Sequence, residues 1–174
     1  MMVGYSETSS PFHFSGYASL FNLADLSGDR VMLGAFHRSL KARGTAGIRM
    51  LWNHDPGEPI GVWRSITEDA YGLKVEGRLT PNVERSSALA HLIKDGALDG
   101  LSIGFHTVRS DKPKALNGQK ALRRLIEVDL WEISLVAFPM QPGARIRTFD
   151  PPGMPIGHPI PAPSPDPSLA SLPL

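Results

Sequence analysis

One serine in this sequence has small neighbours on both sides. Ser102 lies in the segment 100–105 (GLSIGF), between two glycines that leave room for a substrate carbonyl to approach. A serine hydroxyl becomes a nucleophile only when a neighbouring base takes its proton. A catalytic role for Ser102 therefore requires that the chain also supply a base and a group that orients this base.

His54 is the histidine best placed to act as that base. It follows the predicted strand 48–52, in the segment 53–56 (NHDP). A histidine at the end of a strand is held by the sheet yet open to solvent, and its ordinary pKa of about 6.5 suits a general base. The alternative is a turn histidine that only bonds the backbone. His106 has the same strand parity as Ser102, so it lines the same site or is solvated.

Glu132 is the carboxylate that best fits a third role. It stands alone in the apolar segment 130–136 (LWEISLV), where burial of a charge is costly unless the charge is paired. A carboxylate beside the base would hold the imidazole in one tautomer and stabilise its cationic form. The alternative is a solvent-facing position on an antiparallel strand, and Asp129 and Asp55 are then the remaining carboxylates.

The pattern Gly-x-Ser-x-Gly also occurs in α/β-hydrolases, where the serine sits in a strand-to-helix turn and the histidine follows the acid. Here the residues after Ser102 predict a strand. The histidines that follow are His106, on the same predicted strand, and His158, in a proline-rich segment. An unrelated serine esterase is therefore disfavoured, and a purely structural serine is a further alternative.

Short alternating segments predict a mainly β protein with a few α-helices. Because most of these segments are joined by short turns, we expect a largely antiparallel sheet or barrel. Capping residues and apolar spacing predict two helices. The predicted strands are 13–20, 30–33, 48–52, 59–66, 73–79, the strand of Ser102 and 122–138, and the predicted helices are 35–42 and 82–95.

Proline divides the chain into a folded part and a tail. Nine of the 16 prolines lie in residues 150–174, a segment without Lys or Arg, which predicts an extended, disordered tail. The predicted organisation is a flexible N-terminus at 1–10, one domain at 11–149 and the proline-rich tail at 150–174.

Composition argues against several classes of function. The formal net charge is +1, which gives no electrostatic reason to expect nucleic acid or a membrane surface as partner. There is no cysteine, and no apolar run reaches the roughly 18 residues that span a bilayer. Without a signal peptide, a cytoplasmic protein is expected. The spacing of histidines and carboxylates predicts no metal site, and no glycine-rich phosphate loop is present.

Four blocks of this sequence, taken together and in order, resemble a known family. They are 14–18 (FSGYA), 51–61 (LWNHDPGEPIG), 100–105 (GLSIGF) and 131–145 (WEISLVAFPMQPGAR). In this combination they resemble the prohead, or capsid maturation, serine proteases of tailed bacteriophages, which are related to the herpesvirus assemblins. The resemblance covers about residues 11–147, and similar proteins occur in prophages and gene transfer agents.

The resemblance implies a compact, assemblin-like β-barrel with surrounding helices. It also implies a serine endopeptidase that needs no cofactor. Position by position, Ser102 matches the nucleophile, His54 the base and Glu132 the third member, where assemblins have a second histidine. The backbone of residues 143–145 is expected to hold the oxyanion.

The implied substrates are the scaffold segment and the N-terminal segment of the major capsid protein, and the enzyme itself. Cleavage would take place within the procapsid in the host cytoplasm, and assemblins imply a homodimer by analogy. The main alternative is a catalytically silent assembly or scaffolding factor of the same fold. A β-domain with no activity is the last alternative.

Overall fold

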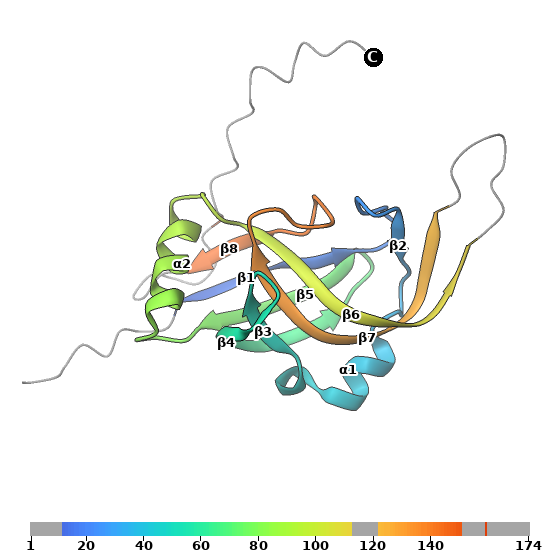
Figure 1. Cartoon of the computed structure of the whole chain (residues 1–174), viewed down its shortest axis with the longest axis horizontal. Coiled ribbons are helices and arrows are strands. Elements are labelled where there is room, and N and C mark those ends of the chain that lie inside the picture. Colours follow the sequence, from blue (N-terminus) through green and yellow to red (C-terminus); the bar gives the residue numbers. More distant parts are fainter. Residues whose placement is uncertain (1–11, 113–121, 151–158, 160–174) are drawn as a thin grey trace, which may run out of the picture.

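The structure, a computed structural model, describes residues 12–112 and 122–150 together with Pro159 (Figure 1). The predicted flexible N-terminus at 1–10 lies outside the described residues. The predicted tail at 150–174 also lies outside them, apart from Asp150 and Pro159. The predicted domain boundaries therefore stay predictions.

The chain folds as a mainly β protein with two α-helices. The helices are α1 (His37–Arg43) and α2 (Glu84–Lys94), and a short 3-10 turn follows α1 at Thr45–Gly47. The strands are β1 (His13–Leu20), β2 (Asp29–Val31), β3 (Arg49–Trp52), β4 (Asp55–Glu68), β5 (Gly72–Leu79), β6 (Gly100–Asp111), β7 (Arg123–Val136) and β8 (Ile146–Asp150).

The eight strands form one mixed sheet in the order β2-β7-β3-β4-β5-β1-β8, with β6 paired to β7. Strands β2 and β3 run parallel to β7, and the other pairings are antiparallel. The mainly β class with few helices is thus confirmed. The parallel pairs were not predicted, because they join segments far apart in the sequence. Short turns predict pairing only between strands that follow each other along the chain.

The sheet is an open path, and a closed barrel is not shown. Between β6 and the start of β8 there is a single bridge, at Gly100 and Arg145. It is made by the Leu101 N–H to the Ala144 carbonyl at 3.0 Å and the Ile146 N–H to the Asp99 carbonyl at 2.7 Å. Strand β8 itself was missed, because it is short and directly follows the proline-containing loop.

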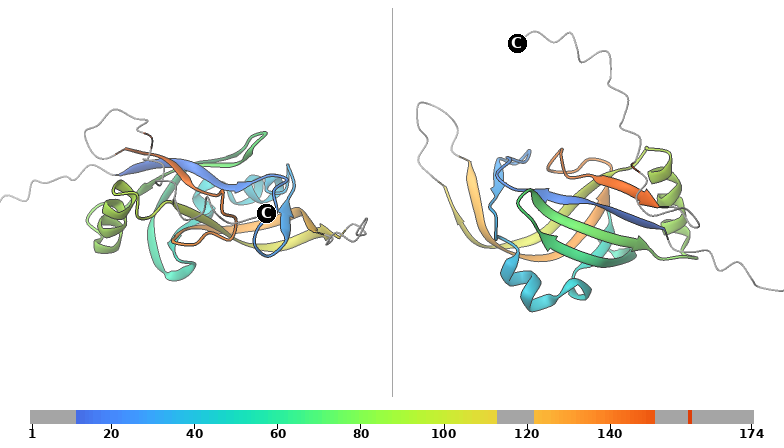
Figure 2. Two further views of the ribbon diagram at one scale, coloured as in Figure 1. Left: turned by 90° about the horizontal axis from the view of Figure 1, so that it is seen from above. Right: turned by 180° about the vertical axis from the view of Figure 1, so that it is seen from behind.

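The apolar core lies between two parts of the curved sheet. Strands β6 and β7 are nearest the viewer in Figure 1, and β1, β5 and β8 are nearest in the rear view of Figure 2. Leu101, Ile133 and Leu135 face inward and are fully buried. Because side chains alternate along a strand, Ser102, Glu132 and Ser134 belong to the opposite, outer face.

Helix α2 differs in detail from its prediction. Its buried positions are Ser86, Leu89, Ala90 and Ile93, spaced three and four residues apart. The apolar residues of the predicted helix 82–95 define a stripe of Val83, Leu89, Leu92 and Ile93, of which Leu89 and Ile93 are buried but Leu92 is 43% exposed. The prediction was correct for Leu89 and Ile93 and missed Ser86 and Ala90, because these are small residues that carry little hydrophobic signal.

Candidate active site

His54 lies in a tight two-residue turn between β3 and β4. Trp52 pairs with Asp55 across the turn, and the two residues between them have positive φ angles, 51° at Asn53 and 62° at His54. Two left-handed residues are typical of the type I′ turn, whose twist matches that of the flanking strands. The left-handed conformation costs a non-glycine residue roughly 1 kcal/mol, so contacts outside the turn must stabilise it.

Those contacts come from β7. The Asn53 N–H donates to the Leu135 carbonyl at 3.0 Å, and the His54 N–H donates to Ser134 Oγ at 3.1 Å. The turn is therefore fastened to the strand that carries Glu132. Parallel pairing of β3 with β7, with Arg49 opposite Glu132 and Leu51 opposite Ser134, sets this position.

His54 and Glu132 form a hydrogen-bonded pair. His54 Nδ1 lies 2.7 Å from Glu132 Oε1, and the carboxylate side chain is only 13% exposed. The hydrogen bond that His54 donates to Glu132 raises the pKa of His54; partial burial lowers this pKa, and the negative charge of Glu132 raises it further. Because an ionised carboxylate only accepts, Nδ1 carries the hydrogen, which leaves Nε2 of the neutral ring as a proton acceptor.

Ser102 lies on the strand next to Glu132. Its partner across the β6–β7 ladder is Ser134, and the partner of Gly104 is Glu132. Ser102 is 8% exposed, and among the described residues its hydroxyl makes no hydrogen bond to His54. The structure thus places Ser102 and Glu132 on adjacent strands, and His54 in the turn after β3 within hydrogen-bond distance of Glu132. Contacts between nucleophile and base often tighten only when substrate binds.

The presence of glycine at position 104 has a steric explanation. A Cβ atom at Gly104 would lie 2.0 Å from Glu132 Oε1, so the carboxylate keeps its present position only with glycine at 104. A Cβ at Gly100 would lie 2.3 Å from the Val136 carbonyl oxygen. Ser102 sits in a long strand and not in a strand-to-helix turn. The Gly-x-Ser-x-Gly pattern therefore reflects close approach of β6 to β7, and not a hydrolase elbow.

The other carboxylates considered from the sequence have different partners. Asp129 accepts from Arg43 Nε at 2.9 Å and from Arg43 Nη2 at 2.7 Å. Asp55 Oδ1 accepts from the Gly57 N–H at 2.8 Å.

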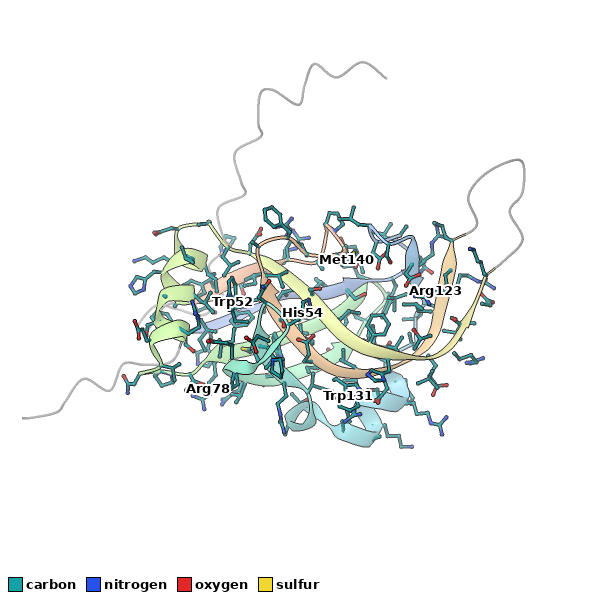
Figure 3. All side chains as sticks on the ribbon, viewed as in Figure 1. Trp52, His54, Arg78, Arg123, Trp131 and Met140 are labelled. Carbon is teal, nitrogen blue, oxygen red and sulfur yellow. The ribbon has the colours of Figure 1, made fainter. Side chains whose placement is uncertain are left out.

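The His106 ring stacks on Trp131 with the ring centroids 5.1 Å apart. Figure 3 shows His54 near the middle of the sheet and Trp131 toward α1.

Ser134 was not singled out from the sequence as a functional residue. It is fully buried, and its hydroxyl donates to Glu132 Oε2 at 2.5 Å. The available signal was its spacing of two residues from Glu132, which puts both on one face of a strand.

A cavity of about 50 Å³ lies beside Ser102. Its lining comes from four strands and two loops, and it includes Ala18, Ser19, Asp25, Asp29, Val31, Leu101, Ser102, Ile103, Phe105, Leu125, Met140 and Gln141. The loop that contains residues 143–145 lies next to β6, because the Leu101 N–H donates to the Ala144 carbonyl. Within the segment 143–145, the Ala144 N–H is already bonded, because it donates to the Gln141 carbonyl at 2.9 Å.

Within residues 12–112 and 122–150, no three metal-ligating side chains gather at one point. In the same part of the chain, no helix has the length and apolar character needed to cross a membrane.

Residues 3–151 match the family model of the caudovirus prohead serine protease. The chain belongs to this family. The prohead protease of Enterobacteria phage HK97 is 37% identical over 137 residues, which are 78% of this chain and 59% of that protein. The chain thus spans about three-fifths of the length of this relative.

The fold also has a solved counterpart in the herpesviruses. The protease of Kaposi's sarcoma herpesvirus, solved with a hexapeptide phosphonate inhibitor, superposes with a TM-score of 0.51 and 14% identity. The match covers 81% of this chain and 65% of that one. At this identity the likeness concerns the fold alone, and it agrees with the herpesvirus-protease-like fold expected of the family.

Proposed function

We propose that this protein is a serine endopeptidase of procapsid maturation, with Ser102 as nucleophile, His54 as base and Glu132 as the residue that orients the base. The observation that carries this proposal is the 2.7 Å hydrogen bond between His54 Nδ1 and Glu132 Oε1, on the strand paired with that of Ser102. Family membership and the HK97 relative support a proteolytic role.

In the proposed mechanism, Ser102 Oγ attacks the carbonyl carbon of a peptide bond while His54 Nε2 takes the hydroxyl proton. Glu132 stabilises the imidazolium that forms and keeps Nδ1 protonated. His54 then gives its proton to the leaving amine, and the acyl-serine remains. Water attacks this ester in the second half of the reaction, with His54 again as base. Backbone N–H groups of Gly143 and Arg145 are the proposed oxyanion donors.

The proposed substrates are the scaffold and the N-terminal segment of the major capsid protein, cleaved within the procapsid in the host cytoplasm, and the protease itself. The HK97 relative is a prohead protease, which supports this setting. A homodimer is part of the proposal by analogy with the assemblins.

The test is co-expression of the full chain with the capsid protein encoded beside it, followed by intact mass measurement. Ser102→Ala is compared with wild type and with Ser86→Ala, a control that removes a buried hydroxyl bonded to the Ile60 carbonyl, away from the site. Shortening with wild type and Ser86→Ala but not with Ser102→Ala supports the proposal. Equal shortening in all three contradicts the assignment. Particles that assemble without any shortening favour the assembly-factor alternative.

A further inference from the structure

We propose that Ser134 is a positioning residue that holds both partners of the His54–Glu132 pair; this inference rests on the proposed function. The Ser134 side chain is fully buried. Its hydroxyl donates to Glu132 Oε2 at 2.5 Å and accepts the His54 N–H at 3.1 Å. These roles are unambiguous, because an ionised carboxylate only accepts and a backbone N–H only donates.

The first effect of Ser134 is on the carboxylate. Glu132 Oε1 binds His54 Nδ1, and Glu132 Oε2 binds the Ser134 hydroxyl, so both oxygens have a fixed partner. The terminal torsion of a glutamate is broad when nothing holds it. With both oxygens held, the plane of the carboxylate is set, and the imidazole must align with it. Removal of the hydroxyl would leave Oε2 without this donor in a largely buried place.

The second effect is on the backbone of the base. His54 has a left-handed φ of 62°, a conformation that needs outside support. Two consecutive residues of β7 give that support: the Ser134 hydroxyl accepts the His54 N–H, and the Leu135 carbonyl accepts the Asn53 N–H. Ser134 thus provides one of the two bonds that fasten the turn.

The third observation is the register. Ser134 is the cross-strand partner of Ser102, and Glu132 is the partner of Gly104. Since β3 pairs with the other edge of β7, Ser134 lies between the strand of the nucleophile and the turn of the base. A single hydroxyl therefore connects the acid, the backbone of the base and the position opposite the nucleophile.

The test compares Ser134→Ala with Ser86→Ala in the full chain. Ser86 is a matched control because it is also a buried serine whose hydroxyl makes one short hydrogen bond, 2.7 Å to the Ile60 carbonyl. Steady-state cleavage is measured on a peptide that spans the site found by mass measurement. The second readout is the far-downfield NMR signal of the His54 Nδ1 proton, recorded in a Ser102→Ala background and assigned by its loss in Glu132→Gln.

We expect Ser134→Ala to lower kcat by about 10- to 100-fold with KM nearly unchanged, the range known for partners that orient metal ligands. We also expect the Nδ1 signal to shift or broaden, and Ser86→Ala to change neither. Either an unshifted signal or a kcat lowered no more than in Ser86→Ala would overturn the inference.

If Ser134→Ala does not fold, the same readouts and criteria apply to Ser134→Cys, which keeps the volume but donates weakly. The NMR signal does not depend on turnover. Activity that persists in Ser102→Ala would therefore refute the proposed function, whereas a signal insensitive to Ser134 would refute only this inference.

Discussion

Two carboxylates on β7, only three residues apart, are paired in different ways. Asp129 binds the Arg43 guanidinium through two hydrogen bonds of 2.9 and 2.7 Å. Glu132 binds the His54 imidazole through one hydrogen bond of 2.7 Å and the Ser134 hydroxyl through another. Asp129 therefore has a permanently charged partner, and Glu132 has a partner whose charge changes near neutral pH.

The surroundings reinforce this difference. Trp131 Nε1 donates to Asp129 Oδ2 at 2.8 Å, and the Arg43 guanidinium lies 4.6 Å from the centroid of the same indole. The Arg43 hydrogen bonds lower the pKa of Asp129 to about 2. Such a cluster is suited to docking α1 on the sheet. Proton transfer requires a group such as His54, whose other ring nitrogen stays available.

The largest contrast is expected from neutralising each carboxylate. Glu132→Gln should lower kcat by about 10³- to 10⁴-fold, because an amide no longer selects the Nδ1-protonated tautomer or stabilises the imidazolium. Asp129→Asn should change kcat by no more than a few fold. Cleavage rates of the capsid peptide by the two variants give the comparison. Comparable losses in both would mean that the two pairs do not have separate roles.

Gly104→Ala tests the space that the carboxylate needs. The added Cβ would lie 2.0 Å from Glu132 Oε1, so the carboxylate must move and the pair with His54 should break. We expect a loss of about 10²-fold or more in kcat. The control is Gly96→Ala, where φ is 73° and an added Cβ would have no atom within 4 Å. This variant should reduce stability by about 1 kcal/mol and leave kcat unchanged. Full activity of Gly104→Ala would contradict the observed packing.

The pH dependence of kcat/KM should follow His54. The pKa of His54 is raised chiefly by its hydrogen bond to Glu132, and the base must be neutral to take a proton. Activity should therefore rise with pH through a midpoint above about 6.5, the ordinary histidine value. Glu132→Gln should move this midpoint to lower pH, and Asp129→Asn should leave it in place. An unchanged midpoint in Glu132→Gln would mean that the His54–Glu132 pair does not set the pH dependence of cleavage.

The smallest effects are on stability, and their pH dependences run in opposite directions for the two pairs. The folded pKa of Asp129 is lowered from 3.8 to about 2, so its pair stabilises the fold above about pH 4, and this contribution is lost as pH falls toward 2. The folded pKa of His54 is raised, so its pair stabilises fully below about 6.5 and loses this contribution as pH rises through the folded value.

For each partly exposed pair we expect at most about 1 kcal/mol. Chemical unfolding of wild type, Asp129→Asn and Glu132→Gln across pH 2 to 9 measures both contributions. The loss caused by Asp129→Asn should shrink as pH falls from about 5 to 2, and the loss caused by Glu132→Gln should shrink as pH rises from about 6 to 9; a loss that stays constant over its own range would contradict the corresponding pair.

The sequence by itself determined much of the local secondary structure. Alternation and turn residues predicted the mainly β class and β1 with its observed bounds of His13–Leu20, since side-chain period depends only on neighbouring residues. The same reasoning, with the family resemblance, selected Ser102, His54 and Glu132, whose catalytic roles remain the proposal to be tested. The largely antiparallel pattern was also predicted, whereas the closed barrel is not shown.

Only the tertiary structure decided which of these residues meet. His54 and Glu132 are 78 positions apart, and the parallel pairing of β3 with β7 brings them together. Periodicity reports the face on which a side chain lies, but not which strand is its neighbour. The space that Gly104 leaves for Glu132 and the two contacts of Ser134 depend on that neighbour, so they followed from the fold and not from the pattern.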